Sequence, residues 1–266
     1  MVSASKLRKA QDAILRMRPY DQKLRNILHH IGADPSVVNT PYLAKREEKN
    51  ILILVVTSNR GLCGGFNALV IKRALKLIEE HKGSQITVLS IGKKAYDYFR
   101  NTEFNIRGTT LPRRLDEVWD DLSYPRIAAI AEKVMDAFEH KQFDRVYFVY
   151  NRFKNAAMQI LMTEQLLPLE LPELAKSKDH SDFIFEPDET TLLEALIPRL
   201  IRTHFYKVLL DSFAAEHGAR MTAMDKATEN AEELLGELHL YYNRARQAAI
   251  TTELTEIVSG ANALEG

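Results

Sequence analysis

The stretch Ile51–Asn67, ILILVVTSNRGLCGGFN, carries the most informative pattern in this chain of 266 residues. Its apolar first half predicts a buried strand, and the glycines that follow predict a tight turn before a helix. A glycine-rich turn between a strand and a helix can bind a phosphate group. The stretch therefore raises two alternatives, a nucleotide site and a purely structural turn.

The glycines of this stretch do not fit the known nucleotide motifs. Gly61, Gly64 and Gly65 do not match G-x-G-x-x-G, and the chain has no G-x-x-x-x-G-K-[ST]. The second predicted strand ends in SIGKK, so it has no acidic residue to hold a ribose. The pattern favours a turn in which glycines allow positive φ and close packing. A small Rossmann-like nucleotide-binding enzyme remains the alternative.

Strand and helix patterns alternate over residues 50–186. We expect helices at 67–80, near 93–100 and at 124–140, and strands at 51–57, 85–91, 145–150 and about 158–163. Such alternation is typical of a mostly parallel sheet covered on both faces. The predicted class is therefore α/β, with a Rossmann-like sheet domain.

Both ends of the chain carry helical patterns. Apolar residues recur at helical steps over residues 3–31, where Pro19 should bend or break the helix. A helix from Tyr206 to Ala261 would be about 80 Å long and should project from the α/β domain. Within it, a heptad seam typical of a coiled coil comprises Met224, Ala227, Ala231, Leu234, Leu238, Tyr241, Ala245 and Ala248.

The two ends have opposite charge, although the whole chain is neutral. Residues 1–31 carry seven basic and two acidic side chains, whereas residues 186–266 carry seven basic and fourteen acidic ones. We therefore expect the helices of 1–31 and 187–266 to pair as an antiparallel coiled coil, with the domain of 50–186 inserted between them. The first helix, about 45 Å long, is too short to cover the whole seam.

Other candidate chemistry in the sequence is weak. Cys63 is the single cysteine, so it can form no intramolecular disulfide, and no histidine or acid is placed to activate it. His29 and His30 are adjacent on a helix and point in different directions. The acidic run at 116–121 favours a solvated surface over a metal site. We expect no catalytic residues, no cofactor and no metal.

Two segments resemble the gamma subunits of F-type ATP synthases. They are SNRGLCGGFN at 58–67, which follows a strand, and ARQAAITTELTEIVSGANAL at 245–264. Further landmarks are ASKLRKAQ at 4–11, RPY at 18–20, EPD at 186–188 and ARMTAMDKAT at 219–228. The order of basic helix, inserted domain and long final helix also matches, so the resemblance covers essentially the whole chain.

The resemblance implies a central rotor stalk that has no catalytic activity of its own. Such a subunit transmits torque between the membrane ion-driven c-ring and the catalytic alpha/beta head during proton-driven ATP synthesis. The implied partners are the alpha, beta and epsilon subunits and the c-ring, with no nucleic acid. The loop of Gly61, Cys63, Gly64 and Gly65 is then structural. The implied contacts with the head are Arg220, Arg246, Gln247, Thr251 and Glu253.

The same resemblance leads to expectations about the first helix of the chain and about the location of the protein in the cell. The family's first helix begins about 25 residues earlier and completes the coiled coil, so we expect a shortened first helix here. The sequence has no window of roughly 18 apolar residues that would span a bilayer, nor a signal-peptide core. We therefore expect a peripheral protein on the cytoplasmic side of a bacterial inner membrane, attached through its complex.

Overall fold

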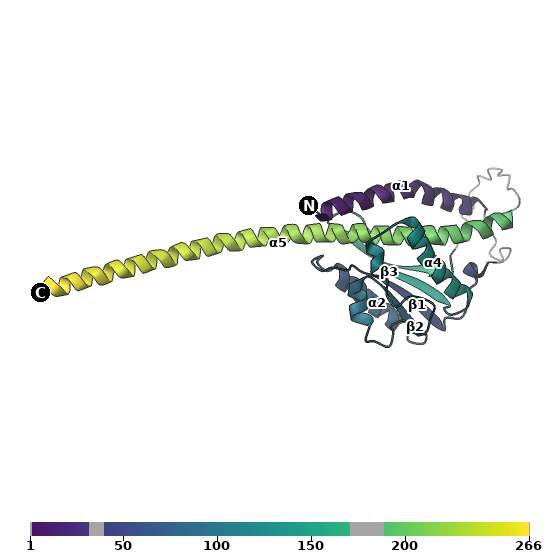
Figure 1. Cartoon of the computed structure of the whole chain (residues 1–266), viewed down its shortest axis with the longest axis horizontal. Coiled ribbons are helices and arrows are strands. Elements are labelled where there is room, and N and C mark those ends of the chain that lie inside the picture. Colours follow the sequence, from purple (N-terminus) through teal and green to yellow (C-terminus); the bar gives the residue numbers. More distant parts are fainter. Residues whose placement is uncertain (1, 32–39, 171–188, 266) are drawn as a thin grey trace. The chain divides into compact units, whose positions relative to one another are not determined.

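The computed structural model describes residues 2–31, 40–170 and 189–265 (Figure 1). The chain divides into two units, Met1–Thr222 and Ala223–Gly266. The first unit is built around a four-stranded sheet, and the second is the later part of the final helix. The first unit thus combines the N-terminal helix, the α/β elements and the start of the final helix.

The sheet is mixed, with three parallel strands and one antiparallel edge strand. Its strands are β1 (Asn50–Val56), β2 (Gln85–Ile91), β3 (Arg145–Phe153) and β4 (Gln159–Leu167), in the order β2-β1-β3-β4. Strand β1 pairs in parallel with β2 and β3, whereas β3 pairs antiparallel with β4. The link between β3 and β4 is too short for a crossover, so β4 folds back. The expected mostly parallel sheet is confirmed.

Strand β1 is the centre of two hydrophobic layers. Ile51, Ile53 and Val55 pack with α2 (Phe66–Glu80) and α3 (Lys93–Phe99) on one face. The alternate residues, starting at Leu52, pack with α4 (Tyr124–Glu139) and the start of α5 on the other face. All six apolar residues of β1 are fully buried, which explains their uninterrupted run in the sequence. Two short 3₁₀ turns, η1 (Pro41–Leu43) and η2 (Glu117–Trp119), complete the unit.

The ends of β1 and β2 come very close together at a glycine. Gly92 has φ +102°, and a Cβ placed on it would lie 2.0 Å from the carbonyl oxygen of Thr57. The Thr57 hydroxyl oxygen, in turn, accepts a hydrogen bond from the backbone N–H of Ala95 at 2.9 Å. Gly92 is therefore required both by its backbone conformation and by the space available.

Helix α1 (Val2–Ile31) is continuous through Pro19, so of the two predicted effects, a bend or a local break, the break is not present. In the first unit α1 runs antiparallel beside α5 (Glu189–Glu265), as Figure 1 shows. Leu7 and Ala10 pack in one cluster with Ala214, and further along α1 Asp21 accepts a hydrogen bond from Lys207 at 3.1 Å. The pairing therefore uses the part of α5 that precedes the predicted seam.

Helix α5 begins at Glu189, close to the start of the predicted C-terminal helix segment 187–266 and before Tyr206, from which its length was reckoned. Its first turns carry Leu193, Ile197, Ile201 and Phe205, which are 2% exposed or less and belong to the same core as α4 and the sheet. Residues 189–205 are therefore helical because they supply one layer of the domain core. The sequence prediction placed these residues in the C-terminal helix but did not assign them to the core of the α/β domain.

In the second unit α5 continues as a helix with exposed side chains throughout Met224–Ala263. Seam residues Leu234, Leu238 and Tyr241 are 56%, 55% and 73% exposed. The described residues thus leave the apolar seam of this unit uncovered. No helix in the described parts of the chain is both long and apolar enough to cross a membrane.

Candidate functional site: the glycine loop and its contacts with α5

The glycine loop, residues 58–67, joins β1 to α2. Gly64 has φ +58° and needs the left-handed region, and Leu62 also adopts φ +61° with its side chain 74% exposed. A Cβ on Gly61 or Gly64 would meet nothing within 4 Å, and one on Gly65 would be 3.6 Å from Leu69. The predicted positive φ is thus confirmed at Gly64, whereas the predicted close packing of these glycines is wrong.

A network of hydrogen bonds closes the loop on itself. The Asn67 side-chain oxygen accepts the backbone N–H of Ser58 at 3.0 Å, and the Ser58 hydroxyl donates to the Arg60 carbonyl at 2.6 Å. The Asn67 amide donates to the Cys63 sulfur at 3.2 Å. Cys63 is 2% exposed and packs with Phe66. Cys63 is thus enclosed by contacts within the loop, and its structural role remains a prediction.

Arg220 of α5 holds the loop from outside. Its Nε donates to the Gly61 carbonyl at 3.3 Å, and its Nη2 donates to the carbonyls of Arg60 and Gly61 at 3.2 and 3.3 Å. Its Nη1 donates to Glu216 at 2.7 Å. Burial raises the pKa of the Glu216 carboxyl, and the hydrogen bond from Arg220 opposes that rise. The guanidinium therefore stabilises both the loop carbonyls and a buried carboxylate.

The turn between β3 and β4 also contacts α5, at residues on either side of Arg220 in the sequence. A Cβ on Gly218 would lie 3.2 Å from both the Cα and the carbonyl oxygen of Ala156, in the turn between β3 and β4. The Thr222 hydroxyl donates to the same Ala156 carbonyl at 3.1 Å. Gly218 thus allows the turn to approach the helix closely. We use the name junction for residues 58–67, 153–158 and 213–222 together.

His217 lies inside the junction and is 5% exposed. Burial, together with the positive charges of Arg220 and Lys6, lowers the pKa of its imidazole to about 4. The ring contacts Phe213 edge-on at 4.5 Å, and its Nδ1 lies 3.4 Å from the Arg220 guanidinium, which can only donate. His217 is therefore neutral at neutral pH, with Nδ1 as the acceptor. His217 thus adds no charge to the junction at neutral pH.

The residues predicted to contact a catalytic head fall into two groups. Arg220 lies in the junction, whereas Arg246, Gln247, Thr251 and Glu253 are exposed on α5 in the second unit. At about 100° per residue, these last four lie within one half of the helix circumference. The Thr251 hydroxyl donates to the Gln247 carbonyl at 2.8 Å. The role of all five as partner contacts remains a prediction.

Sequence reasoning missed three members of the junction, namely Glu216, Gly218 and Thr222. A glycine inside a strong helical pattern was the available signal, because it often marks a close approach. Glu216 and Arg220 also have the i,i+4 spacing of a helical ion pair. Neither signal identifies the loop or turn on the other side of the contact.

Two residues of the acidic run at 116–121 form ion pairs with nearby arginines. In the acidic run, Asp116 pairs with Arg114 at 3.2 Å and Glu117 with Arg126 at 3.5 Å. Among the residues that the structure describes, no cluster of three or more His, Cys, Asp or Glu side chains is arranged to hold a metal. The side chains of His29 and His30, and the EPD segment at 186–188, lie outside the described residues.

Solved structures support the assignment of the fold. The central stalk of the Tetrahymena thermophila mitochondrial ATP synthase matches with a TM-score of 0.59 and 23% identity, over 86% of this chain and 96% of that chain. A chain of the Euglena gracilis mitochondrial ATP synthase matches with a TM-score of 0.57 and 21% identity, over 98% of this chain and 95% of that chain. At this level of identity the likeness concerns the fold alone.

Sequence relatives are much closer. The ATP synthase gamma chain of Christiangramia forsetii is 47% identical over 268 residues, which cover 100% of this chain and 91% of the relative. That of Geobacter metallireducens is 42% identical with the same coverage. The profile of a family described as ATP synthase matches residues 1–264. The chain therefore belongs to the ATP synthase gamma chain family, as its glycine loop and C-terminal motif predicted.

Proposed function

We propose that this chain is the central rotor stalk of an F-type ATP synthase. It has no catalytic activity of its own, and it transmits torque between the membrane c-ring and the alpha/beta head that makes ATP. The observation that carries this proposal is the double use of α5. Residues 189–222 of this one helix belong to a packed domain, whereas residues 224–263 expose an apolar seam and a polar face.

A helix that transmits torque needs firm attachment to the domain that receives or delivers it. The junction supplies attachment through Arg220, which bonds two loop carbonyls, and through Thr222, which bonds the turn at Ala156. The core residues of 193–209 add apolar packing over several turns. Twisting α5 would therefore have to break these hydrogen bonds and the core contacts together.

The polar face of the second unit is the proposed contact with the catalytic head. Arg246 and Glu253 are one heptad apart, and Gln247 and Thr251 are one turn apart, so each pair is aligned along the helix. Arginine and glutamate side chains form charge-assisted hydrogen bonds to oppositely charged loops. Such contacts break and re-form readily when they stay near solvent. A rotating shaft requires contacts of this kind.

The other partners and the location belong to the same proposal. The epsilon subunit and the c-ring bind the globular end, and the chain is membrane-associated through the complex. Relatives in bacteria such as Flavobacterium johnsoniae, at 46% identity, support the cytoplasmic side of a bacterial inner membrane. Protease treatment of sealed inverted membrane vesicles tests this location. In such vesicles the cytoplasmic side faces outward, so the chain should be accessible to the protease.

Reconstituted complexes test the contact residues. We expect Arg246→Ala and Glu253→Gln each to lower the ATP hydrolysis rate of the assembled enzyme about tenfold, the effect of losing one charge-assisted contact in a rate-determining state. The matched controls are Thr252→Ala and Glu256→Gln, whose positions lie on the opposite half of the helix. Equal rates for all four variants would contradict the proposed contact face, while failure of every variant chain to assemble would contradict the rotor role.

A further inference from the structure

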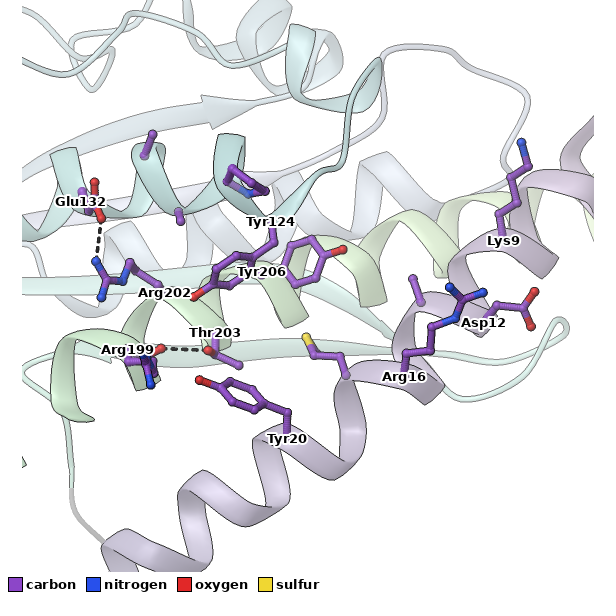
Figure 2. A pocket seen from close by; sticks show the side chains of 15 residues that line it. Lys9, Asp12, Arg16, Tyr20, Tyr124, Glu132, Arg199, Arg202, Thr203 and Tyr206 are labelled. Atoms are coloured by element: carbon purple, nitrogen blue, oxygen red, sulfur yellow. Dashed lines mark hydrogen bonds and ion pairs between the residues drawn. The ribbon is translucent and has the colours of Figure 1, made fainter. Parts of the chain in front are cut away.

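A groove in the first unit lies outside the junction and outside the face proposed for the catalytic head. It has a volume of about 1030 Å³ and is lined by three helices (Figure 2). Its lining includes Lys9, Arg16 and Tyr20 of α1, Ala128 and Ala129 of α4, and Arg199 of α5. We call it the three-helix groove.

The floor and one wall of the groove are apolar. Ala128 is buried and Ala129 is exposed in the lining, so the α4 side is smooth and leaves room above it. Tyr124 and Tyr206 meet edge to face with ring centroids 5.5 Å apart. Burial raises the pKa of the Tyr206 hydroxyl, so that group stays neutral. This surface suits small apolar side chains lying along the helices.

The rim of the groove is positively charged. Arg202 forms an ion pair with Glu132 at 2.6 Å, so these two charges offset each other. The structure records no ion pair or hydrogen bond with described residues for the side chains of Lys9, Arg16 and Arg199, and Asp12 is the remaining acid at the rim. Figure 2 shows Arg16 and Tyr20 extending from α1 and Arg199 from α5. The groove therefore has an excess of unpaired positive charge.

The shape of the groove favours a helix over a small molecule. Small-molecule sites usually occupy about 300–1000 Å³ and enclose most of the ligand. This groove is slightly larger than that range and is lined along the sides of α1 and α5. Lys9 and Arg16 are seven residues apart on α1, which places them about 10 Å apart along one face. Two carboxylates with the same spacing on a partner helix would match them.

We propose that the three-helix groove binds an acidic amphipathic helix of a partner protein. Two carboxylates seven residues apart pair with Lys9 and Arg16, a third acidic group pairs with Arg199, and small apolar side chains cover Ala128 and Ala129. Apolar burial supplies affinity in helix-in-groove recognition, and the charges select the partner. The proposal rests on the groove alone and does not require the rotor role.

A designed peptide provides the first test. The probe is a fluorescent stapled helix with two glutamates seven residues apart and alanines and leucines between them, and the matched probe has glutamines in their place. Anisotropy titrations of the full chain should show binding of the acidic helix that is at least about tenfold tighter than that of the glutamine helix, and high salt should reduce the difference. Equal binding of the two helices would overturn the proposal.

Variants locate the binding on the molecule. Arg16→Glu and Arg199→Glu should each weaken binding of the acidic helix about tenfold, because like charges then face each other. The matched control is Arg107→Glu, which also reverses the charge of an exposed arginine. Arg107 is not part of the groove lining, so this change should leave binding unchanged. Circular dichroism confirms that each variant folds. Equal loss in all three variants would mean nonspecific attraction and would overturn the proposal.

The assembled enzyme provides the second test. A photo-crosslinking amino acid replaces Tyr20, which is 45% exposed at the rim. Crosslinking of purified ATP synthase should attach this position to an acidic helical segment, and Arg16→Glu should abolish that product. Attachment to a segment without acidic residues would overturn the proposal. So would tight binding of inorganic pyrophosphate that depends on Arg16 and Arg199, because the site would then belong to a small anion.

Discussion

The first 34 residues of α5, up to Thr222, and the remainder of that helix use similar side chains in opposite ways. Phe205 and Leu209 are fully buried, whereas Leu238 and Tyr241 are 55% and 73% exposed. Both parts have helical periodicity, so periodicity alone does not distinguish a core helix from a shaft. The difference lies in what contacts the helix: a sheet, α4 and two loops in the first part, and no described residue along the seam of the second.

The largest expected contrast is between two variants of α5 in which a large apolar side chain is truncated to alanine. Phe205→Ala should lower the free energy of unfolding by about 3–5 kcal/mol, because it leaves a cavity beside Phe148, whose ring centroid is 4.9 Å away. Leu238→Ala should change it by less than about 0.5 kcal/mol, because the side chain is already exposed. Urea denaturation of the full chain measures both. Similar losses would mean that the second part of the helix is also packed in solution.

Replacing an arginine should also affect the free energy of unfolding differently in the two parts of α5. Arg220→Ala should cost about 3 kcal/mol, because it leaves the Glu216 carboxylate buried without its partner. Arg246→Ala, at an exposed position, should cost less than about 0.5 kcal/mol. The same denaturation series measures the two variants, and Glu216→Gln in the Arg220→Ala background should recover part of the loss.

The cost of Arg220→Ala should depend on pH. The folded pKa of Glu216 is raised above its ordinary value of 4.5, so the folded state holds the proton more tightly than the unfolded state. The penalty for burying the charge is therefore absent well below pH 4.5 and grows as pH rises through the folded pKa. The stability difference between the variant and the parent should narrow in acid to the part that comes from the bonds of Arg220 to the loop carbonyls. A constant gap across the pH range would contradict this account of Glu216.

Two helical glycines offer a smaller contrast of opposite sign. Gly218→Ala should destabilise the chain by about 1–3 kcal/mol, because the new Cβ is too close to the backbone of Ala156. Gly236→Ala should stabilise its helix by up to about 1 kcal/mol, since nothing lies within 4 Å and alanine favours helix. Thermal melts followed by circular dichroism measure both. Stabilisation by both changes would show that the close approach of Ala156 to the helix does not require a glycine at position 218.

Two threonines provide the smallest contrast. Thr222→Val removes the hydrogen bond to Ala156 and should cost about 1 kcal/mol. Thr228→Val removes only an exposed bond to the Met224 carbonyl of its own helix, so the change should stay within about 0.5 kcal/mol. Hydrogen exchange at the β3–β4 turn should increase in the first variant alone. Equal exchange in both would show that Thr222 does not hold the turn.

Local patterns were sufficient to predict most of the elements. The apolar run of β1 and the alternation that follows it identified the α/β class, and the four strands lie close to where they were expected. These features depend on neighbours within a few residues, which the sequence displays directly. The glycine loop joins a strand to a helix, as the pattern of residues 51–67 predicted, whereas the interpretation that it binds no nucleotide stays a prediction.

Long-range packing accounts for the rest. The pairing of the two terminal helices was expected, but the sequence did not show that it involves Ala214, that residues 193–209 enter the domain core, or that Arg220 contacts the carbonyls of the glycine loop. These contacts join segments more than a hundred residues apart or lie within a core. Of the two effects expected of Pro19, a bend or a break, the break is not present. The sequence shows which residues are able to form such contacts, but it does not show which segments the fold brings together.

The close approach at Gly92 restricts which substitutions this chain can accept during evolution. A side chain there would need to occupy the position of the Thr57 carbonyl oxygen, at the end of the central strand. A nucleotide change that replaces this glycine is therefore incompatible with the present sheet, and its codon has only synonymous alternatives. In a library of all single substitutions selected for folding, position 92 should return glycine alone, while position 61, where a Cβ meets nothing, should return many residues.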